Sequence, residues 1–404
     1  MSELHDVVII GAGPAGSTAA NLLAVAGLDV VVLERAVFPR FHVGESLLPC
    51  DLPLLERLGI EPDGERFQYK GGAEFFDERS GDHVIYPFAD GLDGTPEHAW
   101  QVERAVFDQL LATAASGRGA KIRFGEAATA VSFDKDAVRV QVGAAELRAR
   151  YLIDASGQDA LLAREFSAVE PLKDMGRAAV FGHYKGISPA IQAELGADGN
   201  VKILLIDDGW IWLIPLVGGR VSVGVVKWRG KIDEALHERE IAASPLLQRL
   251  LAGSQRTPLR ILGNFAFRNR RSLGSRYVCV GDAACFLDPV FSSGISLAML
   301  GAEQVADRLV LALARGDEAD PALMVPYSER MQSAYDSFEQ LIRRFYHSRM
   351  IHNLFFGGDP DPELRRGLIS VLAGDIWRDD NRFQALLMAS KRRRRPRMAP
   401  PGQA

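Results

Sequence analysis

The sequence predicts an α/β fold, in which a Rossmann-like dinucleotide-binding domain is interrupted by an antiparallel β-sheet and followed by a helical C-terminal region. Three observations support this prediction: a strand–glycine–helix pattern at the start, a three-stranded meander in the middle, and a late strand that ends in Gly-Asp. The 404 residues are 47% hydrophobic, which is ample for a buried core. The dinucleotide-binding domain is expected at 1–65, 102–175 and 270–316, the antiparallel sheet at 66–101 and 176–269, the helical region at 317–390, and a disordered basic tail at 391–404.

The first 35 residues carry the strongest local motif. An apolar strand, Val7–Ile10, runs into Gly11-x-Gly13-x-x-Gly16 and then into a helix of small residues. Gly11 permits the tight turn, Gly13 lets the backbone approach a pyrophosphate, and Gly16 lets the helix pack on the strand. Free N–H groups at the helix start attract phosphate, and Glu34 at the end of the next strand can accept hydrogen bonds from a ribose. An adenine dinucleotide is therefore expected here.

The following elements alternate between helices and strands. Helices are expected over 46–58, 103–116, 294–316 and 321–350, and strands over 121–124, 128–133, 137–142 and 277–280. The meander is expected as strands 201–207, 210–217 and 220–228, joined by the turn dipeptides Asp208-Gly209 and Gly218-Gly219. Nicotinamide dehydrogenases usually keep their parallel sheet contiguous, so an inserted antiparallel sheet favours a flavoprotein.

Two later strands end in motifs that can complete a flavin site. Tyr151–Gly157 is an apolar strand that ends in a small-residue turn, and Tyr277–Asp282 ends in Gly281-Asp282. The Asp282 carboxylate can bind ribityl or ribose hydroxyls. The helix expected after Ser293 can stabilise negative charge at its N-terminus or hold an anion there.

Composition and charge exclude several classes of protein. The net charge is −5, so nothing global indicates nucleic acid, and the eight histidines show no metal-ligand spacing. The three cysteines, with no CxxC motif, are expected to be reduced thiols that form neither a disulfide nor a metal site. The first strand begins almost at once, leaving no signal peptide, and the glycines within 7–33 argue against a membrane span. We therefore expect a cytoplasmic protein with no bound metal and no membrane or nucleic-acid partner.

Taken together, four motifs resemble the flavin monooxygenases with a para-hydroxybenzoate-hydroxylase-type fold. They are the opening glycine pattern, FPRFHVGES (38–46), ERxxFD (103–108) and GDAACFLDPVFSSG (281–294). Within that group the chain is similar to the FAD-dependent halogenases, also called the tryptophan-halogenase-like family. This narrower resemblance rests on FPRFHVGESLLP (38–49), FQYKGGAEF (67–75) and the WxWxIP signature at 210–215. It covers most of residues 1–300.

The resemblance implies FAD as the cofactor and assigns roles to particular residues. The residues implied to bind FAD are Gly11, Gly13, Ala15, Gly16, Glu34, Arg40, Arg104, Asp282 and Gly294. Lys70 occupies the place of the family's essential lysine, which binds hypohalous acid by a hydrogen bond or forms a chloramine beside the substrate. An apolar setting would lower the pKa of such a lysine. Backbone N–H groups around Ser293 and Gly294 are implied to hold the halide.

The tryptophan signature allows two interpretations. Strand periodicity places Trp210, Trp212 and Ile214 on one face. In the halogenases this wall is thought to keep substrate away from the flavin, but the same side chains could simply fill the core of the sheet, and both can hold together.

One departure from the family bears on the substrate. Phe291 stands where the tryptophan halogenases carry a glutamate, which favours a phenol, pyrrole or carrier-bound aromatic substrate over tryptophan. A second nucleotide fingerprint for NADPH is absent, so reduced flavin would come from a separate reductase or from transient NAD(P)H binding. The expected function is therefore FAD-dependent halogenation of an electron-rich aromatic in secondary metabolism. The alternatives are a monooxygenase that hydroxylates or epoxidises, and an oxidoreductase of the geranylgeranyl-reductase kind.

Overall fold

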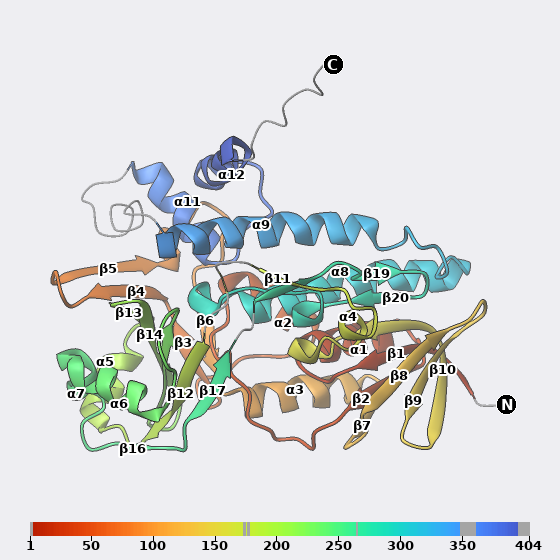
Figure 1. The fold of residues 1–404 in the computed structure, drawn as a ribbon, viewed down its shortest axis with the longest axis horizontal. Coiled ribbons are helices and arrows are strands. Elements are labelled where there is room, and N and C mark those ends of the chain that lie inside the picture. The colour runs from red at the N-terminus through yellow and green to blue at the C-terminus, as the bar shows by residue number, and fades with distance from the viewer. Residues whose placement is uncertain (1–2, 173–174, 176–177, 264–265, 348–360, 395–404) are drawn as a thin grey trace.

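A computed structural model describes residues 3–172, 175, 178–263, 266–347 and 361–394 (Figure 1). Its parallel sheet has the strand order β19-β20-β10-β1-β2-β7, in which β20, β10, β1, β2 and β7 are parallel neighbours. The carboxyl ends of the parallel strands therefore meet at one edge, as the sequence predicts for a dinucleotide-binding sheet. The strands are β1 (Leu4–Ile10), β2 (Val30–Glu34), β7 (Lys121–Phe124), β8 (Ala128–Phe133), β9 (Val138–Val142), β10 (Ala145–Asp154), β19 (Leu273–Gly274) and β20 (Tyr277–Cys279).

Helices from three parts of the chain pack beside this sheet. The first is α1 (Pro14–Val25), whose residues from Pro14 to Ala24 are all buried, because small side chains let it lie close to its neighbours. It contacts α3 (Arg104–Gly117) and α8 (Ser293–Arg315). Residues nearly 300 positions apart in sequence thus share one core.

The predicted meander is confirmed as the centre of an antiparallel sheet (left in Figure 1). Its strands are β4 (Gly72–Asp77), β5 (Asp82–Pro87), β12 (Ala178–Lys185), β13 (Val201–Ile206), β14 (Gly209–Leu216), β15 (Arg220–Lys227), β16 (Gln255–Arg256) and β17 (Arg260–Gly263). The β14–β15 turn is formed by Gly218 and Gly219 with φ of +71° and +67°, values that favour glycine. Asp208, with φ of +55°, serves the β13–β14 turn.

Strand β14 is buried on both faces and divides two cores. Trp210, Trp212 and Ile214 join the large core that includes the parallel-sheet helices. Ile211 and Leu213 point into a separate core on the opposite face. The predicted single-face arrangement of the signature is therefore confirmed.

Shorter elements connect the two sheets. The strands are β3 (Phe67–Lys70), β6 (Ala99–Val102), β11 (Val169–Pro171), β18 (Phe267–Asn269) and β21 (Cys285–Phe286); the α-helices are α2 (Leu52–Arg57), α4 (Leu161–Glu165), α5 (Pro189–Gly196), α6 (Glu234–Ala243) and α7 (Pro245–Leu250). The 3₁₀-helices are η1 (Pro49–Asp51), η2 (Phe88–Asp90), η3 (Gly157–Asp159), η4 (Gly281–Ala283) and η5 (Pro289–Phe291). The helix expected over 46–58 instead begins at η1, because Pro49 has no N–H and starts a helix rather than continuing one.

The C-terminal region is helical, as expected. Helix α9 (Val325–His347) runs lengthwise across the molecule in Figure 1 and packs on α8. It is followed by α11 (Pro362–Leu372) and α12 (Arg382–Arg394). Residues 391–394, expected to belong to a disordered tail, are instead helical, and the rest of the expected tail, 395–404, lies outside the described residues. None of the described helices has the length and apolarity that crossing a membrane requires.

Candidate active site

A crevice of about 1180 Å³ lies between the carboxyl edge of the parallel sheet and one face of the antiparallel sheet. This is larger than pockets that hold drug-sized ligands, and it has room for a dinucleotide. Most of the site residues assigned from the sequence line it, namely Gly11, Gly13, Ala15, Glu34, Arg40, Arg104, Trp210, Trp212, Asp282, Ser293 and Gly294. Gly16 and Lys70 are not among its lining residues.

The glycine motif leaves backbone exposed at the head of α1. Gly11 has φ of +99°, and a Cβ there would lie 2.4 Å from the Ala155 carbonyl oxygen. A Cβ on Gly16 would lie 1.9 Å from the Gly11 oxygen, so Gly16 acts through close packing rather than by facing the crevice. A Cβ on Gly13, in contrast, would have only the Arg40 guanidinium within 4 Å, at 3.7 Å, so the backbone here leaves room for a phosphate. These three environments fit an FAD pyrophosphate on the N-terminus of α1.

Glu34 is held in place at the end of β2. Its two carboxylate oxygens accept hydrogen bonds from the N–H groups of Ala12 and Ala36, both at 2.9 Å. The side chain is buried yet borders the crevice. Its fixed position fits the recognition of a ribose.

Arg104 is a buried cation that organises the loop after β2. It makes a bidentate ion pair with Asp108, at 2.7 and 2.9 Å, and donates to the Val43 carbonyl at 2.8 Å. Arg40 binds the same Asp108 carboxylate at 3.0 Å. Both guanidinium groups thus present positive charge to the crevice from fixed positions.

Opposite them, Asp282 and the start of α8 form the other wall. Loss of solvent raises the pKa of Asp282 to about 7, against the attraction of Arg104. Helix α8 follows Ser292, which has φ of +57° and makes no side-chain cap. Ser293 and Gly294, in the first turn, line the crevice, and no side chain caps this helix end. An anion bound here would satisfy the N–H groups of that turn.

The tryptophans of β14 close the crevice on its apolar side. The Trp212 indole donates to the Ser222 hydroxyl at 3.1 Å, and the Trp210 indole donates to the Tyr346 hydroxyl at 2.7 Å. Tyr346 in turn donates to Asp288 at 2.8 Å, in the loop that leads to α8. Both rings belong to the core, which confirms the core-filling interpretation, and both also line the crevice. Their role as a barrier between substrate and flavin remains a prediction.

Lys70 lies at the end of β3, 1% exposed. Its Nζ donates to the Leu47 carbonyl at 2.8 Å and lies 5.2 Å from the centre of the Phe88 ring. Burial lowers the pKa of Lys70 to about 7, partly opposed by the negative charge of Asp51. The side chain is thus desolvated, as the apolar setting of the motif led us to expect.

Three groups beside the site were missed in the sequence. Glu45, which lines the crevice, forms a buried ion pair of 2.7 Å with His183. Burial disfavours the charged imidazole, but the hydrogen bond and charge of Glu45 outweigh this and raise the pKa of His183. Tyr346 gave no local signal because its partner Trp210 is 136 residues away. Asp51 did give a local signal, because an acid within the apolar run SLLPCDLPLL needs a buried partner.

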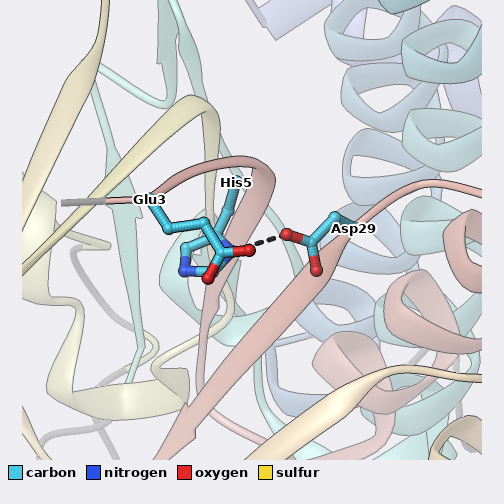
Figure 2. A group of neighbouring side chains, drawn as sticks. All are labelled: Glu3, His5 and Asp29. Carbon is cyan, nitrogen blue, oxygen red and sulfur yellow. Dashed lines mark hydrogen bonds and ion pairs between the residues drawn. The ribbon is translucent and has the colours of Figure 1, made fainter. Parts of the chain in front are cut away.

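A second cluster of ligand-type side chains lies apart from the crevice (Figure 2). Glu3 and His5 stand beside Asp29, and His5 Nδ1 is 2.7 Å from an Asp29 carboxylate oxygen. The other Asp29 oxygen binds Lys121 at 2.8 Å. Because these bonds already engage the carboxylate, we assign no metal to this cluster.

Comparisons with known proteins agree with this geometry. The model of the tryptophan halogenase family matches residues 6–97 and 91–356. The 1H-pyrrole-2-carbonyl peptidyl-carrier-protein brominase of Pseudoalteromonas luteoviolacea is 30% identical over 93% of this chain and 93% of its own length. The corresponding chlorinase of Pseudomonas fluorescens is 28% identical over 92% and 90%.

A solved structure shows the same fold over nearly the whole chain. The flavin-dependent brominase Bmp2 superposes with a TM-score of 0.82 at 28% identity, covering 97% of this chain and 99% of that one. Its likeness extends into the C-terminal helices, where the sequence resemblance had been least secure. The chain is therefore a flavin-dependent halogenase, with FAD as its cofactor, and belongs to the tryptophan halogenase family.

Proposed function

We propose that this halogenase transfers chlorine or bromine to an electron-rich ring, a phenol or a pyrrole, through Lys70. When bound, reduced FAD with O₂ supplies the oxidising equivalent that converts halide into hypohalous acid. Lys70 then positions that acid beside the ring, and the exchange of a ring hydrogen for the halogen releases water. The observation that carries this proposal is a buried lysine on β3, a strand that contacts the tryptophan-bearing β14.

The residues assigned from the sequence divide the work of the crevice. Gly11, Gly13 and Ala15 would hold the FAD pyrophosphate, Glu34 a ribose, and Arg40, Arg104 and Asp282 the remainder of the cofactor. Ser293 and Gly294 would hold the halide through their N–H groups. Trp210 and Trp212 would form the apolar barrier that excludes the organic substrate from the flavin.

The substrate class follows from the apolar surroundings of Phe291. This side chain is 4% exposed and packs edge-on against Phe345, with ring centres 5.6 Å apart. A tryptophan substrate that depends on a carboxylate at position 291 would find none here. A phenol or a pyrrole needs no carboxylate at this position. The relatives that act on pyrrolyl carrier proteins support a carrier-bound ring. We further propose that the protein works in the cytoplasm and that a separate flavin reductase supplies its reduced FAD.

Product analysis tests the function directly. The enzyme would be supplied with FAD, a flavin reductase, NADH, oxygen and bromide, and offered simple phenols, free pyrrole-2-carboxylate or its carrier-bound thioester. The expected result is a product with the paired isotope pattern of bromine. Hydroxylated product without bromine, in the presence of saturating bromide, would contradict the proposal.

A further inference from the structure

We propose that Asp51 is the positioning carboxylate of Lys70: it sets the charge of the lysine and ties it to helix α8. The inference deepens the proposed function, because it concerns the lysine to which halogen transfer is assigned. It rests on contacts of Asp51 and Lys70 with a single peptide group and on the burial of both side chains.

The two side chains bind opposite ends of the Leu47–Leu48 peptide. Lys70 Nζ donates to the Leu47 carbonyl oxygen at 2.8 Å, and the Leu48 N–H donates to Asp51 Oδ2 at 2.9 Å. The carbonyl end of a peptide dipole is negative and its N–H end is positive. The Lys70 cation and the Asp51 anion are therefore stabilised by the same peptide dipole. Each charge also polarises that peptide in the direction that favours the other charge.

Burying two charged side chains costs free energy unless nearby groups stabilise each charge. Asp51 is fully buried and Lys70 is 1% exposed. The second carboxylate oxygen, Asp51 Oδ1, has no hydrogen-bond partner among the described residues. An isolated carboxylate would be strongly disfavoured here. The Leu48 N–H, the Ser296 hydroxyl and the charge of Lys70 each favour the ionised form of Asp51.

The groups that face this pair are few. Within the described residues, Asp51 is the charge that acts on Lys70, while Asp51 is acted on by Lys70, the Ser296 hydroxyl and the Leu48 N–H. The Cys50 thiol is the adjacent titratable group, and burial raises its pKa far above the ordinary value. Burial raises the pKa of Asp51 to about 6 and lowers that of Lys70 to about 7, and the charge of each group favours the ionised form of the other, so their titrations are coupled.

Asp51 also connects the lysine to the proposed halide site. The Ser296 hydroxyl donates to Asp51 Oδ2 at 2.7 Å, and Ser296 lies one helical turn after Ser293 on α8. A movement at the head of α8 would therefore act on the carboxylate directly.

The test is the titration of Lys70 in the full-length protein, followed by NMR with lysine labelled at the ε-carbon. The Lys70 signal is identified by its loss in Lys70→Arg. In Asp51→Asn, which keeps an oxygen that can accept from Leu48 and Ser296, the Lys70 midpoint is expected to fall by about one pH unit or more. An unchanged midpoint in a folded Asp51→Asn protein would overturn the proposal.

A matched variant separates charge from hydrogen bonding. Ser296→Ala removes one hydrogen bond to Asp51 and keeps the carboxylate, so the Lys70 midpoint should stay near the wild-type value. Asp51→Glu, which restores a carboxylate, should recover part of the shift. If Asp51→Asn does not fold, the wild-type curve decides: the Lys70 signal should show a second step as Asp51 ionises, and a single step would refute the coupling.

These outcomes are independent of the halogenation chemistry. If Lys70→Ala retains full halogenation while Asp51→Asn still shifts the Lys70 titration, the proposed role of Lys70 is wrong and the pairing stands. If Lys70→Ala is inactive but Asp51→Asn leaves the Lys70 titration unchanged, the proposed role of Lys70 stands and the pairing with Asp51 is wrong.

Discussion

At the scale of single residues, Lys70 is the side chain on which the proposed chemistry depends. Lys70→Ala should reduce halogenation to background while FAD affinity and flavin reoxidation stay unchanged, because Lys70 is absent from the crevice lining. Lys70→Arg should fail as well, since a planar guanidinium cannot reproduce the compact ammonium group of Lys70 in this buried position. Product formation, FAD titration and oxygen uptake would be measured on both. Full halogenation by the alanine variant would exclude the lysine from the mechanism.

The pH profile follows from the lowered pKa of Lys70, about 7. Its Nζ is a hydrogen-bond donor in the structure, and Asp51 favours the charged form, so we expect the ammonium to be the active species. Below this pKa the charged ammonium is present, and as the pH rises through about 7 it is converted into the neutral amine. Single-turnover halogenation should therefore decline from about pH 6 to about pH 8, whereas a rate that rises over this range would indicate the amine and a chloramine route.

Motifs could predict individual residues only where one segment carries the whole signal. Glu34 and the three glycines belong to one strand–turn–helix unit, and the structure places them as that unit requires. The Asp51–Lys70 pairing depends on how the loop after Ser46 lies against β3, which no local pattern determines. The lysine was therefore predictable, whereas the sequence indicates that Asp51 needs a buried partner but not that the partner is Lys70.

At the scale of elements, Tyr346 joins the tryptophan strand β14 to the loop before α8. Tyr346→Phe removes the hydroxyl between Trp210 and Asp288, leaving a buried donor and acceptor without that partner, at a cost of about 1–3 kcal/mol of unfolding free energy. A displaced Trp210 should also increase hydrogen peroxide leakage from the flavin. Denaturant unfolding and a peroxide assay would measure the two effects.

Tyr335 on the same helix provides the matched control. Its hydroxyl is buried and has no hydrogen-bond partner among the described residues, so Tyr335→Phe should leave both stability and peroxide leakage unchanged or improve stability slightly. Equal behaviour of the two variants would show that the Tyr346 bridge has no special role. The sequence predicted α9 as a helix but not this bridge, because its helical pattern carries no information about a strand 136 residues earlier.

At the scale of the whole molecule, FAD binding requires the close approach of α1 to β1. Gly16→Ala should gain about 1 kcal/mol of helix propensity, but its Cβ would overlap the Gly11 oxygen at 1.9 Å, so steric conflict should dominate. We expect a lower melting temperature and loss of FAD binding by calorimetry. Gly64→Ala, where a Cβ would meet nothing within 4 Å, should change neither. Unaltered FAD affinity in Gly16→Ala would contradict this account of the motif.

The discontinuous organisation of the molecule was predictable because each part has its own periodicity. The opening motif and the Gly281-Asp282 turn indicated one parallel sheet, and the glycine turns of the meander indicated the antiparallel one. The crevice between the sheets was not predictable in detail, since its walls come from segments that meet only in the folded chain. The proposed domain boundaries remain a prediction.

The tryptophans at the crevice have a further consequence for the enzyme as a working catalyst. Indole rings are electron-rich, so they are attacked by the oxidising reagent that a halogenase generates. Trp210 and Trp212 line the space where hypohalous acid would first appear. Each turnover would expose them to oxidation by the reagent that the enzyme itself produces. The working life of an enzyme molecule would then be set by the number of catalytic cycles rather than by elapsed time.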